Sequence, residues 1–185
     1  MTPQICRQYM TTMRVPMQIR SANLTDRTAL GELQRETISE SADYYVSTPA
    51  EYERDWNGSP NRLEQILAGD NSIWLIADIE GYLVGSLDFM GGTYERTRHV
   101  GTFGLTVRRE NRNQGIGGAL VETLLIWARD HPVIEKLTCS VFSNNLKAMS
   151  LYTRFGFQTE GRRHREYRMQ HGRYLDAIIL SKWIK

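Results

Sequence analysis

A glycine-rich transition from a strand into a helix is the feature that most restricts the fold of this chain. Residues 100–107 alternate apolar and polar side chains, which predicts a strand. Residues 115–129 follow with an apolar stripe at helical spacing and three glycines in the first turn. Backbone N–H groups converge at such a helix N-terminus, and the helix dipole adds positive charge. We therefore expect residues 112–118 to bind a phosphate.

The glycine loop fits neither of two common nucleotide-binding motifs. A P-loop ends in Gly-Lys-Ser/Thr, and the chain contains no Gly-Lys pair. A dinucleotide fingerprint needs Gly or Ala at the position that Leu120 holds. What remains is the spacing Arg-x-x-Gly-x-Gly over 112–117. Three neighbouring arginines add charge that can complement a diphosphate, namely Arg108, Arg109 and Arg112.

Length and composition place the chain among ordinary globular proteins. Its 185 residues suit one domain, and the apolar fraction of 41% is enough for a core. A net charge of +2 argues against a strongly basic nucleic-acid-binding protein. Cys6 and Cys139 cannot form a disulfide framework, which indicates a reducing compartment. Because no apolar run fits a signal peptide or a membrane span, we expect a cytoplasmic protein.

Hydrophobic periodicity predicts a mixed α/β domain. Residues 1–16 carry no clear pattern, and we expect a loosely ordered tail before a single domain at 17–185. Helices are expected around 24–37, from the capping box Thr48–Glu51, and around 63–69. After them the expected order is strands at 72–77, 82–89 and 100–107, a helix at 115–129, a strand at 137–142, a helix at 144–154, and strands at 157–168 and 174–184.

A second segment identifies the kind of phosphate ligand. Residues 145–157 read N-x-x-A-x-x-x-Y-x-x-x-G-F, and on a helix Asn145, Ala148 and Tyr152 lie at i, i+3 and i+7, so they face one ligand. This segment resembles the corresponding part of the GNAT superfamily of N-acetyltransferases. The Arg-x-x-Gly-x-Gly loop resembles the acyl-CoA pyrophosphate loop of the same superfamily. The resemblance extends over about residues 17–185 and is most specific within 103–157.

The resemblance implies a fold, a co-substrate and a set of binding residues. The implied fold is a predominantly antiparallel sheet, splayed at its centre and flanked by helices. The implied co-substrate is acetyl-CoA, without a metal. Its pantetheine would pair with the strand backbone, its pyrophosphate would rest on the loop amides, and Tyr152 would protonate the departing thiolate as general acid. The residues that this assigns to the cofactor are Leu105, Thr106, Val107, Arg112, Asn113, Gln114, Gly115, Ile116, Gly117, Gly118, Asn145, Ala148 and Tyr152.

The general base is not fixed by the motifs. A protonated amine must lose a proton before it attacks, and the candidates are Asp88, His99, Glu160 or a chain of waters. An acetyl-cysteine intermediate on Cys139 is disfavoured, because this cysteine lies in an apolar strand and buried cysteines are inert. We therefore expect direct transfer to a primary amine.

The acceptor is the least constrained part of the interpretation. Residues 157–161 and 171–176 resemble spermidine N-acetyltransferases, and also the acetyltransferases of ribosomal-protein N-termini. We expect a small amine such as a polyamine, with a protein N-terminus or a non-catalytic acyl-CoA-binding module as alternatives. The basic run 162–168 is interpreted as a solvated strand edge. Neither nucleic acid nor a membrane is an expected partner, and a homodimer is compatible with the resemblance.

Overall fold

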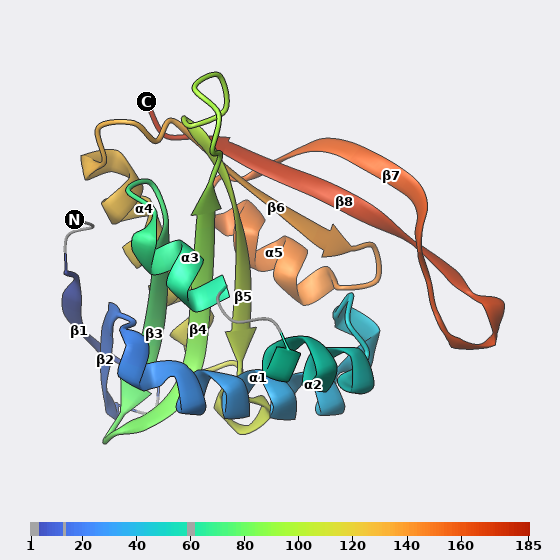
Figure 1. Cartoon of the computed structure of the whole chain (residues 1–185), viewed down its shortest axis with the longest axis horizontal. Helices are drawn as coiled ribbons and strands as arrows, with labels where there is room; N and C mark the ends of the chain where they lie inside the picture. Colours follow the sequence, from blue (N-terminus) through green and yellow to red (C-terminus); the bar gives the residue numbers. More distant parts are fainter. Residues whose placement is uncertain (1–3, 13, 59–61) are drawn as a thin grey trace.

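The computed structural model describes residues 4–12, 14–58 and 62–185. These residues form an eight-stranded sheet in the order β1-β2-β3-β4-β5-β6-β8-β7 (Figure 1). Neighbouring strands are antiparallel except β5 and β6, which are parallel. The strands are β1 Cys6–Met10, β2 Pro16–Ser21, β3 Ile73–Ile79, β4 Tyr82–Gly91, β5 Val100–Val107, β6 Lys136–Phe142, β7 Gln158–Arg168 and β8 Tyr174–Trp183. This confirms the mixed α/β class and the predominantly antiparallel sheet.

The helices begin and end close to where the sequence predicts. They are α1 Arg27–Glu40, α2 Pro49–Gly58, α3 Arg62–Ala68, α4 Ile116–Asp130 and α5 Leu146–Arg154. The capping box before α2 is confirmed, because the Glu51 N–H donates to Thr48 Oγ1 at 3.3 Å and the Thr48 N–H donates to the Glu51 carboxylate at 2.8 Å. Within the described part of the chain, no helix is long and apolar enough to cross a membrane.

Helices cover both faces of the sheet and bury two hydrophobic clusters. On one face, α4 places Trp127 edge-on against Phe89 of β4, with ring centroids 5.4 Å apart. On the other face, α1 contributes Leu30 and α3 contributes Ile66, and both pack near Trp74 of β3. Figure 1 shows α3 and α4 on opposite sides of the sheet. The sheet is therefore buried at its centre and open toward its ends.

The N-terminal segment differs from the expectation of a loose tail. Cys6–Met10 forms strand β1, which pairs antiparallel with β2 from Cys6 opposite Arg20 to Met10 opposite Pro16. The sequence pattern does not reveal this strand, because it lies at the edge of the sheet and most of its side chains are exposed. A half-buried strand shows alternation, whereas an exposed edge strand need not.

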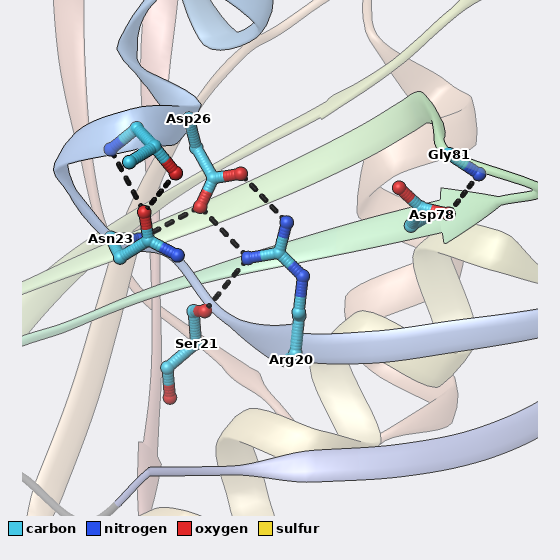
Figure 2. A network of polar contacts seen from close by, with 7 residues as sticks. Arg20, Ser21, Asn23, Asp26, Asp78 and Gly81 are labelled. Carbon is cyan, nitrogen blue, oxygen red and sulfur yellow. Dashed lines mark hydrogen bonds and ion pairs between the residues drawn. The ribbon is translucent and has the colours of Figure 1, made fainter.

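A polar network fixes the start of α1 (Figure 2). Arg20 of β2 donates from Nη2 to Asp26 Oδ1 at 2.7 Å and from Nη1 to Oδ2 at 2.8 Å, and the Asn23 N–H donates to the same carboxylate at 2.8 Å. Burial opposes ionisation of Asp26, but these hydrogen bonds outweigh it and lower the pKa of Asp26 below its usual value. The network holds the start of α1 against β2, and the segment that follows the other end of α1 lines the site described below.

Strands β5 and β6 separate after a short paired region. Their register runs from Val100 opposite Lys136 to Thr102 opposite Thr138 and then stops, although both strands continue. Figure 1 shows the two strands diverging below this point. Rings of Phe103, Tyr152 and Phe157 pack together at the divergence, with the Phe103 and Tyr152 centroids 5.2 Å apart. The expected splay of the central sheet is thus confirmed, and it leaves backbone groups of β5 without a partner strand on that side.

Candidate active site

A cavity of about 480 Å³ opens where β5 and β6 diverge. Its walls come from β5, from the loop and first turn of α4, from α5 and from the segment that follows α1. Most of the residues that the sequence assigned to the cofactor line it: Leu105, Val107, Arg112, Asn113, Gly115, Ile116, Gly117, Gly118, Asn145, Ala148 and Tyr152. Residues from two distant motifs therefore meet at one site.

Thr106 and Gln114 do not line the cavity. The alternation of β5 places the Thr106 side chain on the opposite face of the sheet from Leu105 and Val107, where its Oγ1 lies 3.3 Å from the Tyr45 hydroxyl. The Gln114 side chain donates to the Glu110 carbonyl at 2.9 Å. Neither side chain is available to a ligand in the cavity.

The first turn of α4 forms the phosphate end of the cavity. Gly115 has φ +87°, a left-handed conformation that glycine adopts without strain, and the first helical bond runs from the Ala119 N–H to the Gly115 carbonyl at 3.0 Å. The N–H groups of the preceding turn therefore have no partner within the helix. A Cβ on Gly117 would lie 3.4 Å from Leu105 and from Leu151, so the small residue lets the helix lie close to β5 and α5. The geometry matches an anion site.

The three neighbouring arginines do not act together on a diphosphate, as the sequence suggested. Arg108 is only 3% exposed, its Nε donates to the Leu83 carbonyl at 2.7 Å, and it forms an ion pair with Glu36. Arg109 is exposed and is not part of the cavity wall. Arg112 lines the cavity, but its guanidinium is hydrogen-bonded within the protein. Sequence proximity could not distinguish a buried structural arginine from a ligand-facing one.

Several residues of the cavity wall were not predicted. Lys147 and Arg154 of α5 line it and are exposed, so they supply the positive charge that the arginines before α4 do not. Asn111 and Asn144 also line it, and within the described residues the Oδ1 of each is buried without a hydrogen-bond partner. The remaining unpredicted lining residues are Ser41, Tyr44, Tyr45, Leu146 and Leu151. The signal in the sequence that could have indicated some of them is adjacency to a predicted residue, as for Asn111 beside Arg112, Asn144 and Leu146 beside Asn145, and Leu151 beside Tyr152.

Tyr152 lies in the interior end of the cavity. It is 5% exposed, packs edge-on against Phe103, and burial raises the pKa of its hydroxyl far above the usual value. The hydroxyl has no hydrogen-bond partner among the residues that the structure describes. Tyr152 therefore keeps its proton at neutral pH and has a donor available to a bound molecule.

Asn145 caps α5 and thereby shapes the adjacent wall. Its side-chain Oδ1 accepts from the Ala148 N–H at 3.1 Å, which satisfies one of the free amides at the start of the helix. The side-chain NH₂ group of the same amide stays available to donate toward the cavity. Asn145, Ala148 and Tyr152 all line the cavity, as their spacing predicted.

Asp88 lies apart from the other two candidate bases. Asp88 of β4 sits opposite Gly104 of β5, within the splayed region, and its carboxylate accepts from Arg62 Nε at 3.0 Å. His99 precedes β5 at its paired end, where its ring stacks on Trp183. Glu160 is ion-paired with Lys136, and the hydrogen bond from Lys136 lowers its pKa. The charge of Asp88 adds a small contribution to the raised pKa of Tyr152, after burial.

Cys139 is buried in β6, and burial raises the pKa of its thiol to about 12. A thiol in this environment is neutral at physiological pH, and the thiolate is the nucleophilic form. The site therefore offers a helix N-terminus for an anion, an open strand edge and a protonated tyrosine, but no activated cysteine.

An open strand edge, a helix N-terminus with free amides and a buried tyrosine thus meet at one cavity. The family model described as the acetyltransferase (GNAT) family matches residues 35–157, and the chain belongs to this family. The resemblance on which the sequence interpretation was based is confirmed. Strands β1 and β2 precede the matched region.

Individual relatives agree with the family. L-amino acid N-acetyltransferase AaaT of Escherichia coli (strain K12) is 29% identical over 108 residues, which are 58% of this chain and 66% of that protein. The match thus spans just under two thirds of this curated relative. Among solved structures, an acetyltransferase of the GNAT family from Streptococcus pneumoniae has a TM-score of 0.76 and 25% identity, covering 91% of this chain and 99% of that chain. The ribosomal-protein-alanine N-acetyltransferase of Brucella melitensis has a TM-score of 0.71 and 25% identity, covering 89% and 98%.

Proposed function

We propose that this protein is an acetyl-CoA-dependent N-acetyltransferase that transfers the acetyl group directly to a primary amine. The observation that carries the proposal is the meeting of the α4 N-terminus, the open edge of β5 and the Tyr152 hydroxyl at one cavity. An acyl-CoA needs these three elements in this order, because it has a diphosphate at one end, an amide-containing arm, and a thioester at the other end.

The unsatisfied groups of the cavity suit this co-substrate. The free N–H groups at Gly115–Gly118 would hold the pyrophosphate, and Lys147 and Arg154 would add positive charge. The arm of CoA carries amide N–H donors, and the buried oxygens of Asn111 and Asn144 are acceptors that need donors. The backbone of β5 beyond Thr102 would pair with the arm as a strand would.

The chemistry would divide between Tyr152 and the β5 backbone. The amine nitrogen forms a bond to the acetyl carbon, and the carbon–sulfur bond breaks. A backbone N–H of β5 would stabilise the negative charge on the carbonyl oxygen, and the Tyr152 hydroxyl would donate its proton to the departing sulfur. Holding the amine and the thioester together in the cavity would supply much of the acceleration.

We assign the role of general base to Asp88, acting directly or through water. Its carboxylate lies in the splayed region, on the face of the sheet that carries Gly104 and Thr106 and outside the cavity wall, so the amine would approach from that face. His99 and Glu160 lie at the paired end of β5 and β6. The amine loses a proton to this carboxylate before or during attack. Arg62, which binds the carboxylate, would hold it in position.

The charges around the cavity favour an acceptor with a carboxylate over a polyamine. A polycation would need free acidic groups, but no carboxylate of the described residues lines the cavity, and three others are each bound by an arginine: Asp43 by Arg173, Asp88 by Arg62, and Asp176 by Arg162. Arg62 and Arg173 are more than half exposed, so their guanidinium groups can also contact an anionic substrate. We therefore propose an L-amino acid as acceptor, which agrees with the name of the Escherichia coli relative. A protein N-terminal alanine is the second candidate, supported by the name of the Brucella melitensis structure.

A panel of matched amines tests the function and its acceptor together. Release of CoA thiol would be measured with an L-amino acid, its amide and the amine that lacks the carboxyl group, and then with spermidine and a peptide that begins with alanine. The expected result is the highest kcat/KM for the L-amino acid and the lowest for the amine without a carboxyl group. Preference for spermidine would restore the polyamine interpretation. Thermal stabilisation by acetyl-CoA without turnover on any amine would instead support the binding-module alternative.

A further inference from the structure

The N-terminal ribbon, which consists of β1, β2 and the described residues of their turn, is anchored to α4. The Tyr9 hydroxyl lies 2.9 Å from Thr123 Oγ1, and the Thr123 hydroxyl itself donates to the Ala119 carbonyl at 2.8 Å. Because the Thr123 proton is engaged in that bond, the Tyr9 hydroxyl is the donor to Thr123. Ile5 and Tyr9 also pack against the core cluster on the α4 face. The ribbon is thus fixed to the helix that begins at the phosphate end of the cavity.

The ribbon also directly contacts residues 112–118, which are called the phosphate loop from here on. The Thr12 N–H donates to the Gln114 carbonyl at 3.1 Å. The Thr12 methyl group would lie 3.8 Å from a Cβ on Gly115, which is ordinary van der Waals contact. Gly115 lines the cavity. One turn of the ribbon therefore forms the outer support of the loop whose inner side faces the ligand site.

The turn that carries Thr12 is held by its own hydrogen bonds. Thr11 is buried, its N–H donates to the Val15 carbonyl at 2.9 Å, and its Oγ1 accepts from the Val15 N–H at 3.0 Å. The Arg14 N–H donates to the Thr11 carbonyl at 2.9 Å. Thr12 thus presents its N–H from a hydrogen-bonded turn.

The geometry of one peptide bond connects this contact to ligand binding. The Gln114 carbonyl and the Gly115 N–H belong to the same trans peptide unit, so they point in opposite directions. Holding the carbonyl toward Thr12 therefore directs the Gly115 N–H away from the ribbon and toward the cavity. We propose that the N-terminal ribbon is a positioning element of the cofactor site, in which Thr12 orients the Gly115 amide for the pyrophosphate. This inference rests on the proposed acetyl-CoA site.

Thr12→Pro tests the proposal, because proline removes the N–H donor, and Thr12→Ala is the matched control that keeps it. We expect Thr12→Pro to raise the Kd of CoA and the KM of acetyl-CoA by about threefold to tenfold, with kcat at saturation changed less than about twofold. Thr12→Ala should behave like the wild type. S-Acetylpantetheine lacks the diphosphate, so its kcat/KM should be the same for all three proteins. An equal loss with this short donor would indicate general damage and overturn the proposal.

Tyr9→Phe provides a second variant that keeps the ring and removes the hydroxyl that anchors the ribbon. The protection that bound CoA gives the amides at 115–118 in hydrogen exchange should be smaller in both variants than in the wild type, while the interior of α4 keeps its protection. If Thr12→Pro does not fold, Tyr9→Phe decides the question through the Kd of CoA. If the wild type binds CoA and the variants show the same Kd and the same exchange at 115–118 as the wild type, the proposed role of the ribbon is overturned. A wild type that does not bind CoA would instead overturn the proposed function.

Discussion

Arg112, the arginine of the glycine-loop motif, donates from Nε to the carbonyl of Val107, the last residue of β5, at 3.0 Å. The same guanidinium donates from Nη2 to Ser41 Oγ at 3.1 Å, in the segment that follows α1. One side chain thus joins the strand end, the phosphate loop and the opposite wall of the cavity. We expect this side chain to hold these three parts in register around a bound ligand.

Replacement of Arg112 by lysine should therefore impair binding although the charge is kept. A single ammonium group cannot reproduce the planar fork that reaches Val107 and Ser41 at once. The KM of acetyl-CoA is expected to rise about tenfold, which corresponds to the loss of one charge-assisted hydrogen bond. Arg109→Lys, at an exposed position outside the cavity wall, is the control and should leave KM unchanged. Equal KM values for both variants would contradict this role.

Gly115→Ala should weaken both folding and cofactor binding. The residue has φ +87°, where a side chain costs about 1–2 kcal/mol. We expect a loss of about that size in the free energy of unfolding, together with a higher Kd for CoA because the amides of the turn shift. Gly161→Ala is the matched control, since no atom lies within 4 Å of its added Cβ and its φ is not positive. If Gly115→Ala has the same free energy of unfolding as Gly161→Ala, the prediction is contradicted, because the turn then accepts a side chain without strain.

The stability of the protein should depend on pH through Asp26. The hydrogen bonds from Arg20 and Asn23 lower its pKa in the folded state, so the carboxylate stabilises the fold above about pH 4, the unfolded value. This contribution is lost as the pH falls through the lower folded-state pKa. Asp26→Asn is expected to reduce the free energy of unfolding by about 2 kcal/mol at pH 7, and the difference from wild type should shrink in acid. Urea titrations at pH 7 and pH 3 measure this difference in the free energy of unfolding. A difference that is larger at pH 3 than at pH 7 would contradict the prediction.

Cys139 should be dispensable for transfer. Burial raises the pKa of its thiol to about 12, so the thiolate is scarce at neutral pH. Cys139→Ala should keep kcat within about twofold while losing about 1 kcal/mol of stability from the missing buried sulfur. Mass spectrometry of the protein mixed with labelled acetyl-CoA should show no acetylated enzyme. A covalent adduct that disappears in the variant would establish a ping-pong route instead.

Local patterns predicted the elements, and two motifs predicted the site, because both signals lie within short stretches of sequence. The capping box at Thr48 and the apolar stripe of α4 are signals of this kind. The burial of Arg108 is not, because it depends on Leu83 and Glu36 from elements distant in sequence. The support of Gln114 by Thr12 is also a long-range contact.

Two further features lay outside what local patterns could reveal. Tyr44 and Tyr45 reach the cavity only because α1 crosses below β5, which no periodicity indicates. Strand β1 was missed for a different reason, because an exposed edge strand has no apolar alternation to detect. Long-range packing decides both which polar residues face the ligand and which edge residues form strands.

The role of Tyr152 as general acid is tested by comparing Tyr152→Phe with Tyr45→Phe at saturating acetyl-CoA. Both hydroxyl groups belong to residues of the cavity wall, but Tyr45 is hydrogen-bonded to Thr106 and Tyr152 has its donor available. Steady-state release of CoA thiol with the best amine gives kcat, and calorimetry gives the Kd of acetyl-CoA. We expect Tyr152→Phe to lower kcat by about 100-fold or more with Kd within about threefold, and Tyr45→Phe to keep kcat within about threefold. Unchanged kcat in Tyr152→Phe would contradict the assignment of Tyr152 as the acid that protonates the leaving thiolate.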